Sequence, residues 1–299
     1  MAGRFIAMLA LEQPSVVGLD DLVAALKSRV PELENDIVGR PYRGDKVSAS
    51  EAYIVSISGN HFAVAFVDHP APYGTFDAAL HHSFGNWPDG GVAVERHQAH
   101  VMLSNLVLTK GFNQAVDVAG SVTLIAGLLN SLAASVGVYW ANGEVLLPQA
   151  AFEAATAMLI AGDPPVNAWV NIRSHPGAGD GGEVACLSTL GLDSFCGREI
   201  ETPTSPDDVA SGHERVLAVA ADVLRNGPGL ADNSELRIGE NASVTVNLVD
   251  HGEYDPDQAV IRLTPVAPET GRPVAGSAPS DGGEAPRFAR RKRNKQFAT

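Results

Sequence analysis

Two histidines with the spacing of a metal-binding pair stand out first. His97 and His100 are three residues apart, and side chains at positions i and i+3 share one face of a helix, where both could bind one divalent metal ion. The apolar segment 99–108 is expected to be a strand, which places His97 before the strand and His100 inside it. Two interpretations therefore stay open, namely a metal site that needs further ligands, and two histidines hydrogen-bonded where a strand begins.

A third ligand for such a metal site would have to come from elsewhere, and the candidates are Glu199, His81, His82 and Asp68. Glu199 lies on a predicted strand and points to the opposite side from Arg198 and Ile200, because side chains alternate along a strand. If Glu199 faces inward beside His97 and His100, the three side chains form a polar cleft with the ligand types of a catalytic divalent metal. A metal-assisted hydrolase is the enzymatic hypothesis that follows.

The two cysteines of the chain, Cys186 and Cys196, point to no chemistry. Two thiols alone cannot build a zinc site, and they do not resemble a disulfide framework. A reactive thiol needs a cation or a helix terminus beside it, and Arg198 is the cation closest to Cys196 in the sequence. We therefore expect both thiols to be buried and unreactive.

Complete catalytic signatures are missing from the sequence. The chain has neither the glycine-lysine-serine/threonine of a P-loop nor a G-x-S-x-G turn, and His213-Glu214 lacks the second histidine of H-E-x-x-H. The first function hypothesis is accordingly a non-enzymatic module that binds a protein partner or a small ligand. No cofactor is expected beyond the divalent metal of the alternative hypothesis.

Alternating strand and helix patterns fill the N-terminal part of the chain. Apolar runs predict strands, and a helix over 18–30 follows from its apolar face and the two aspartates in its first turn. The expected order is strand 5–11, helix 18–30, strands 53–58 and 61–68 joined at Gly59-Asn60, helix 76–84 and strand 99–108. This order predicts an α+β, ferredoxin-like sandwich, an antiparallel sheet with helices packed on one face.

The second part of the chain repeats this alternation less clearly. Helices are expected at 118–135, 148–161 and 205–225, and strands at 136–140, 144–147, 168–173, 184–190, 198–202, 243–249 and 260–263. The sequence therefore predicts an N-terminal half over 1–110, a related C-terminal half over 111–264, and a tail over 265–299.

Composition limits the partners that the protein can have. The 299 residues include 21 Lys and Arg against 35 Asp and Glu, a net charge of −14, which disfavours binding to nucleic acid or anionic membranes over most of the surface. Residues 118–140 carry no charge and are long enough to cross a bilayer. Their small and polar side chains and the lack of cationic flanks favour a buried helix, so we expect no membrane insertion and a cytoplasmic location.

The tail carries the opposite charge from the rest of the chain. Proline, glycine, serine and alanine dominate its first half, so we expect it to be disordered. Its basic residues are Arg287, Arg290, Arg291, Lys292, Arg293 and Lys295. One interpretation is an adaptor that this basic end tethers to an acidic partner, and the other is a tail that only solubilises or docks on its own protein.

Several short motifs together carry a family resemblance. They are Arg-His-Gln-Ala-His at 96–100, Gly-Val-Tyr-Trp at 137–140, Thr-Leu-Gly-Leu at 189–192, Phe195, and Gly-Arg-Glu-Ile-Glu at 197–201. With the order of elements, they resemble the bacterial domain-of-unknown-function family 4261 over most of residues 5–264. The resemblance implies a soluble bacterial protein, and it implies no established activity, cofactor or catalytic residue.

The shared positions suggest where a ligand would lie. Trp140 has a large ring with one polar atom, which suits a pocket or the edge of a core. The ligand-pocket candidates are His97, His100, Trp140, Thr189 and Glu199. One departure is Asn233, which stands where the family turn has glycine.

Overall fold

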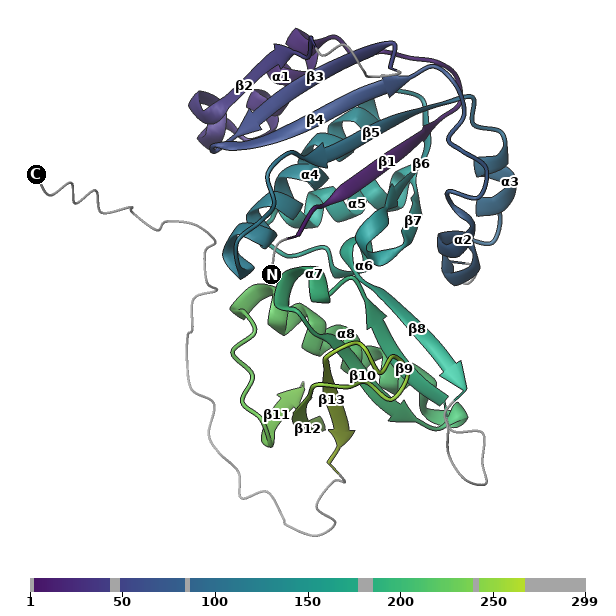
Figure 1. The fold of residues 1–299 in the computed structure, drawn as a ribbon, viewed down its shortest axis with the longest axis vertical. Helices are drawn as coiled ribbons and strands as arrows, with labels where there is room; N and C mark the ends of the chain where they lie inside the picture. The colour runs from purple at the N-terminus through teal and green to yellow at the C-terminus, as the bar shows by residue number, and fades with distance from the viewer. Residues whose placement is uncertain (1–2, 44–48, 84–86, 177–184, 239–241, 267–299) are drawn as a thin grey trace, which may run out of the picture. The chain divides into compact units, whose positions relative to one another are not determined.

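Two β-sheets form the framework of the computed structural model, which describes residues 3–43, 49–83, 87–176, 185–238 and 242–266 (Figure 1). The first sheet has seven antiparallel strands in the order β2-β3-β4-β5-β1-β6-β7. Their bounds are β1 Ile6–Leu11, β2 Ile37–Pro41, β3 Glu51–Ile57, β4 Asn60–Val67, β5 Ala99–Asn105, β6 Ser135–Trp140 and β7 Val145–Pro148. Of the predicted tail over 265–299, only residues 265 and 266 belong to the described residues. The six basic residues of the tail lie outside them.

The second sheet has six strands in the order β11-β12-β13-β10-β9-β8. Its only parallel pair among the described strands joins β10 to β13. The bounds are β8 Asn171–Pro176, β9 Ala185–Leu190, β10 Glu199–Thr204, β11 Ser234–Ile238, β12 Ala242–Val249 and β13 Val260–Pro265. The α+β class with antiparallel sheets is therefore confirmed.

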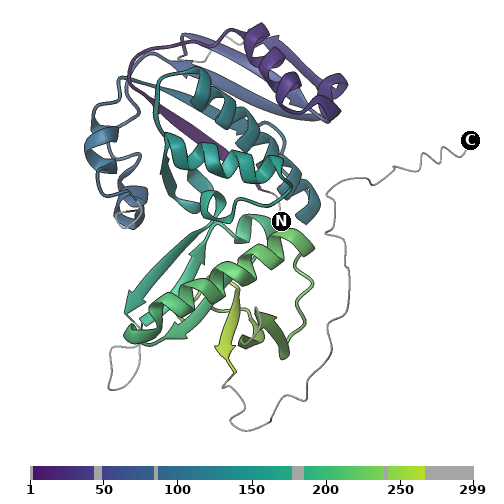
Figure 2. The same ribbon diagram turned by 180° about the vertical axis from the view of Figure 1, so that it is seen from behind.

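Helices cover both faces of the first sheet. One face packs against α1 (Leu19–Arg29), α4 (Phe112–Leu132) and α5 (Gln149–Ile160), which lie in front of the sheet in Figure 2. On the other face, Met8 and Ala10 of β1 join a separate apolar cluster with residues of and around α2 (Asp77–Ser83) and α3 (Gly90–Glu95). The prediction of helices on a single face is wrong for this sheet, because β1 has apolar side chains on both sides.

The strand order also differs from a ferredoxin-like sheet. In that arrangement β1 would lie between β4 and β5, whereas here β5 pairs with both β4 and β1, and β1 pairs next with β6. The expected boundary at residue 110 does not separate the two sheets either. The segment beyond residue 110 supplies β6 and β7 to the first sheet and α4 and α5 to the helices packed on it, because their apolar residues complete the core there. We call the first sheet with its helices the first layer, and the second sheet with its helices the second layer.

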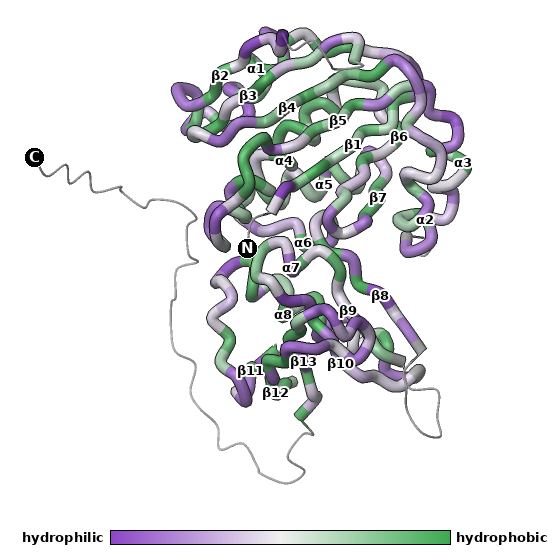
Figure 3. The backbone as a smooth tube through the Cα atoms, viewed as in Figure 1, coloured by the Kyte–Doolittle hydropathy of each residue, from purple (hydrophilic) through white to green (hydrophobic). Residues whose placement is uncertain are grey.

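Helix α4 contains residues 118–132 of the uncharged segment, and it is long and apolar enough to cross a membrane by length and composition alone. In the structure it packs against β1, β5, β6 and α5, and most of its apolar stretch is buried. Figure 3 shows hydrophobic residues concentrated along α4 and the central strands β4, β5 and β1. The packing agrees with the expected buried helix.

A smaller set of helices accompanies the second sheet. They are α6 (Val166–Trp169), α7 (Asp193–Cys196) and α8 (Val209–Asn226), which the short turn η3 (Pro206–Asp208) precedes. The other two short turns are η1 (Pro31–Asp36) and η2 (Ala141–Gly143). Helix α8 packs on β9 and β10 through Val216, Ala220 and Val223, which are spaced on one face and fully buried. One apolar core continues from the first layer into the second.

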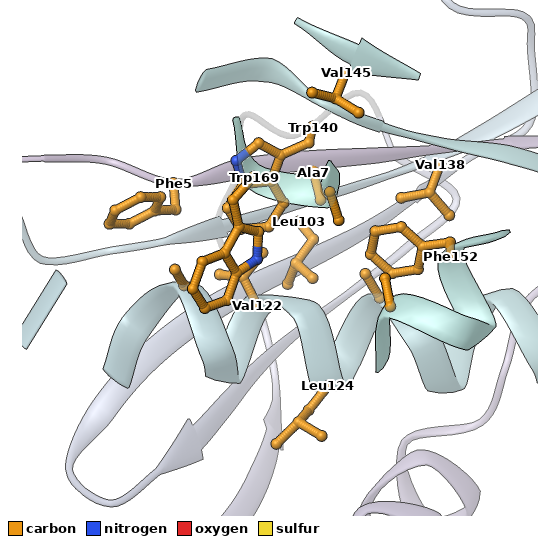
Figure 4. Close-up of a cluster of buried hydrophobic side chains, with 14 of the residues drawn as sticks. Phe5, Ala7, Leu103, Val122, Leu124, Val138, Trp140, Val145, Phe152 and Trp169 are labelled. Carbon is orange, nitrogen blue, oxygen red and sulfur yellow. The ribbon is translucent and has the colours of Figure 1, made fainter. Parts of the chain in front are cut away.

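Trp169 joins the two layers. Its ring stacks between Trp140 of β6 and Phe195 of α7, with centroid distances of 6.2 and 5.3 Å, and its Nε1 donates a hydrogen bond of 2.8 Å to Thr123 Oγ1 on α4. Figure 4 shows Trp169 and Trp140 beside Phe5 and Val122. The indole N–H is buried, so Thr123 supplies an acceptor that water cannot replace there.

We expect Thr123→Val to lower the free energy of unfolding by about 1–3 kcal/mol, because the buried N–H of Trp169 loses its acceptor. The measurement is the urea midpoint at constant m-value. Ser131→Ala on the same helix is the control, because among the described residues the Ser131 hydroxyl is bonded only to the Gly127 carbonyl of its own helix. Equal losses in the two variants would show that Trp169 does not depend on this hydrogen bond.

Candidate functional site

His97 uses both ring nitrogens in hydrogen bonds to the backbone. Its Nε2 accepts a hydrogen bond of 2.8 Å from the N–H of Ala71, so the proton lies on Nδ1, which donates to the carbonyl of Val94 at 2.5 Å. His97 follows α3, immediately before β5. Its ring therefore fixes the segment before α2 against the end of α3.

His100 is buried inside β5, with 3% of its surface exposed. Its Nδ1 donates to the carbonyl of His69 at 2.9 Å. Burial lowers the pKa of His100, which keeps the ring neutral, and the nearby rings of His69 and His97 act in the same direction. This contact agrees with the second interpretation of the sequence, in which the two histidines are hydrogen-bonded where a strand begins.

Glu199 lies at the start of β10 and accepts four hydrogen bonds. They come from Thr189 Oγ1 at 2.5 Å and from the N–H groups of Gly191, Leu192 and Asp193 at 2.6, 3.2 and 3.2 Å. Burial raises the pKa of Glu199, Asp193 adds to this, and the hydrogen bonds from Thr189 and Asp193 N–H oppose it. Through its four hydrogen bonds, the carboxyl group of Glu199 holds the turn between β9 and α7 in place.

The structure does not bring His97, His100 and Glu199 together. The histidines are bonded within the first layer and Glu199 within the second. In the described part of the chain, no three His, Cys, Asp or Glu side chains form a group that could hold one metal ion. The predicted polar cleft of these three residues is not present, because each is engaged by its own local backbone.

The other two pocket candidates are buried in the core. Trp140 is 1% exposed and packs on Phe5 and Trp169. Thr189 is 4% exposed, and besides binding Glu199 its hydroxyl accepts the N–H of Ile200 at 2.7 Å. Neither residue lines a described cavity.

Burial raises the pKa of both Cys186 and Cys196 to about 11. Both thiols are free, and Cys186 is 7% exposed. A thiol with such a pKa is protonated near neutral pH, and the thiolate is the reactive form. The raised pKa values agree with the prediction of unreactive thiols, whereas the prediction of burial holds for Cys186 and not for Cys196, which is partly exposed.

A row of polar residues crosses the second sheet. Strand pairing aligns Arg173, Ser188, Glu201 and Arg262 on neighbouring strands. Glu201 accepts a hydrogen bond of 3.0 Å from Arg262 and also binds the N–H groups of the loop after β12. Burial raises the pKa of Glu201, but these donors outweigh it and the net shift is downward. Within the row, Glu201 pairs with Arg262 and fastens that loop, whereas Arg173 forms its ion pair with Glu144 and Ser188 is hydrogen-bonded to His175.

A cavity of about 540 Å³ lies between α5 and α8. Its walls come from β7, α5, the segment from residue 164 through α6, the start of β8, and α8. The lining residues are Val145, Leu146, Leu147, Ala151, Ala154, Ala155, Met158, Pro164, Pro165, Val166, Asn167, Ala168, Val170, Asn171, Ile172, His213, Leu217, Ala221 and Arg225. All but four of these are apolar, as is typical of a small-molecule pocket.

Helix α8 contributes a stripe with a four-residue spacing to this cavity. His213, Leu217, Ala221 and Arg225 are successive i+4 positions, which lie on one side of a helix and extend over roughly 18 Å. The polar residues are at the ends of the stripe and the apolar residues are between them. This spacing is visible in the sequence, but it overlaps the core-facing stripe of the same helix, so helical periodicity alone does not distinguish the cavity wall from the core.

Among the described residues that line the cavity, Arg225 is the only one with a permanent charge. Its Nε donates to Asp163 Oδ1 at 3.2 Å, in an ion pair whose side chains are about half exposed. Asp163 follows α5 and does not line the cavity. An exposed ion pair of this kind contributes little to stability, so Arg225 can take a second acceptor.

The turn before β11 accommodates Asn233, a position at which the sequence resemblance implied a glycine. Asn233 has a φ of 54°, the left-handed region where asparagine is the side chain best tolerated after glycine. Its neighbour Asp232 accepts the N–H of Leu248 at 2.8 Å. The turn therefore forms without the glycine.

No protein-family model, curated protein or solved structure matches this chain.

Proposed function

We propose that this protein is a small-ligand-binding module, and that its ligand occupies the cavity between α5 and α8. The observation that carries the proposal is the cavity itself, whose volume of about 540 Å³ is in the range of pockets that enclose drug-sized molecules. Burying an apolar ligand against these walls is favourable in proportion to the apolar area removed from water.

The chemistry of the lining supports binding rather than catalysis. Among the described residues, no hydroxyl, thiol or carboxylate side chain lines the cavity, and its polar side chains are Asn167, Asn171, His213 and Arg225. His213 is exposed and has no carboxylate or nucleophile beside it in the lining. Such a set can orient a ligand, while a nucleophile paired with a base would be needed for covalent catalysis.

We expect the neutral dye Nile red to bind the full chain and Ala154→Trp to weaken this binding at least about tenfold. Ala154 is an exposed residue of α5 that lines the cavity, so an indole there fills space that the dye needs. The measurement is a fluorescence titration. Ala157→Trp is the matched control, because Ala157 is an exposed alanine of the same helix outside the lining.

Two results would contradict the proposal. One is an absence of saturable Nile red binding to the wild-type chain. The other is equal binding by Ala154→Trp and Ala157→Trp, which would place the dye outside the cavity. Circular dichroism of both variants shows whether the fold is retained.

A further inference from the structure

We propose that the ligand is an elongated apolar monocarboxylate, with its hydrocarbon chain along α8 and its carboxylate on Arg225. This inference rests on the proposed function, since it assigns a ligand class to the same cavity. The observations behind it are the order of side chains along α8, the charge of the lining and the way in which Arg225 is paired.

The α8 stripe sets the shape of the ligand. Leu217 and Ala221 lie between the two polar ends, and Ala151, Ala154 and Met158 of α5 also line the cavity. The wall is therefore apolar over most of the roughly 18 Å between the α-carbons of His213 and Arg225. A flexible alkyl chain fits such a wall, because it can follow a long surface with no need for polar partners.

The charge of the lining sets the head group. Arg225 is cationic, and no acidic residue lines the cavity in the described part of the chain. A carboxylate is matched by a guanidinium, which offers donors in a planar fork. Only Nε of Arg225 is bonded to Asp163 among the described residues, so the two terminal NH₂ groups remain to receive a carboxylate.

The surroundings of Arg225 favour one negative charge over two. Asp163 already lies 3.2 Å from its Nε. Arg225 is in the last turn of α8, and Asp163 follows the end of α5, so both helix C-termini add partial negative charge there. A dianion such as a phosphate monoester would meet more repulsion than a single carboxylate does.

The test measures competition against Nile red by decanoate and decanol, which have the same chain length and different head groups. For the wild-type chain we expect decanoate to compete more strongly than decanol. Arg225→Gln should weaken decanoate about tenfold and leave decanol unchanged, because a charge-assisted hydrogen bond is removed. Asp163→Asn should strengthen decanoate about twofold to threefold, because Arg225 then has no competing carboxylate.

Arg215→Gln is the matched control for charge. It removes one positive charge from the same helix, at a residue that is paired with Asp208 and does not line the cavity. Decanoate affinity in this variant should stay within about twofold of the wild type, since a distant charge is screened by salt.

The outcomes separate this inference from the proposed function. If Nile red binds and Ala154→Trp blocks it, but decanol competes as strongly as decanoate, the pocket is confirmed and the carboxylate assignment is wrong. The same conclusion follows if Arg225→Gln leaves decanoate unchanged. If Nile red does not bind the wild-type chain at all, the proposed function itself is contradicted.

Discussion

Replacing Glu199 with alanine is expected to lower the free energy of unfolding by about 3–5 kcal/mol. The carboxylate accepts the N–H groups of Gly191, Leu192 and Asp193 and the hydroxyl of Thr189. A buried donor that loses its acceptor costs about 1–3 kcal/mol, and several donors lose theirs together. The turn that begins α7 then has no anchor. Chemical denaturation followed by circular dichroism measures the loss.

Two further variants show whether hydrogen bonding is the cause. Glu199→Gln keeps one acceptor oxygen and turns a donor toward the other N–H groups, so we expect an intermediate loss of about 1–3 kcal/mol. Glu235→Ala removes an exposed glutamate of β11 and should change stability by less than about 0.5 kcal/mol. Unchanged stability in both Glu199 variants, with loss of ligand binding, would instead assign Glu199 to a binding site.

Local pattern was sufficient to predict many of the elements. The alternation in 61–68 predicted β4, and the glycine at residue 59 predicted the hairpin before it, where Gly59 has a φ of 80°. Both features depend on residues that are neighbours in the sequence. The same reasoning missed β2 (Ile37–Pro41), a short edge strand with little alternation in its burial.

The order of the strands could not be predicted from such patterns. The position of β5 between β4 and β1 depends on the chain after β4 passing through α2 and α3 on the second face of the sheet. A strand that is apolar on both sides, like β1, is compatible with several pairings, and only the packing of whole layers selects one.

The sequence singles out three polar residues that do form specific contacts, but it predicts the wrong partners for them. His97, His100 and Glu199 looked like ligands because of the three-residue spacing of the histidines and the strand position of Glu199, but the structure holds them in place for another reason. The reason is the backbone, since Val94, His69 and the turn at Gly191 supply their hydrogen bonds. Those donors and acceptors are present in every sequence, so side-chain identity alone does not show which of them a buried polar residue will meet.

The cavity is formed by residues that lie even farther apart in the sequence. Its α8 wall has a visible four-residue spacing, but its other walls come from β7, α5 and the segment before β8. No local property links residue 154 to residue 221. A pocket between elements becomes predictable only when their packing is known.

Gly191→Ala is expected to lower the free energy of unfolding by about 3–5 kcal/mol. Gly191 has a φ of 104°, which L-amino acids with a side chain rarely adopt, and a Cβ there would lie 2.8 Å from both Gly143 Cα and Trp169 O. These atoms belong to the backbone of η2 and α6, so they cannot move aside as a side chain would. Conformational strain and overpacking each cost about 1–3 kcal/mol.

The variant Gly59→Ala separates the cost of conformational strain from the cost of overpacking. Gly59 also has a positive φ of 80°, but a Cβ there would meet nothing within 4 Å, so this variant measures strain alone, about 1–2 kcal/mol. The excess loss in Gly191→Ala is then the cost of parting η2, α6 and the turn after β9, where the two layers are joined through backbone atoms. Equal losses in the two variants would mean that this junction yields easily. The cavity beside α6 would then change its volume readily, and binding would depend on that movement rather than on a preformed pocket.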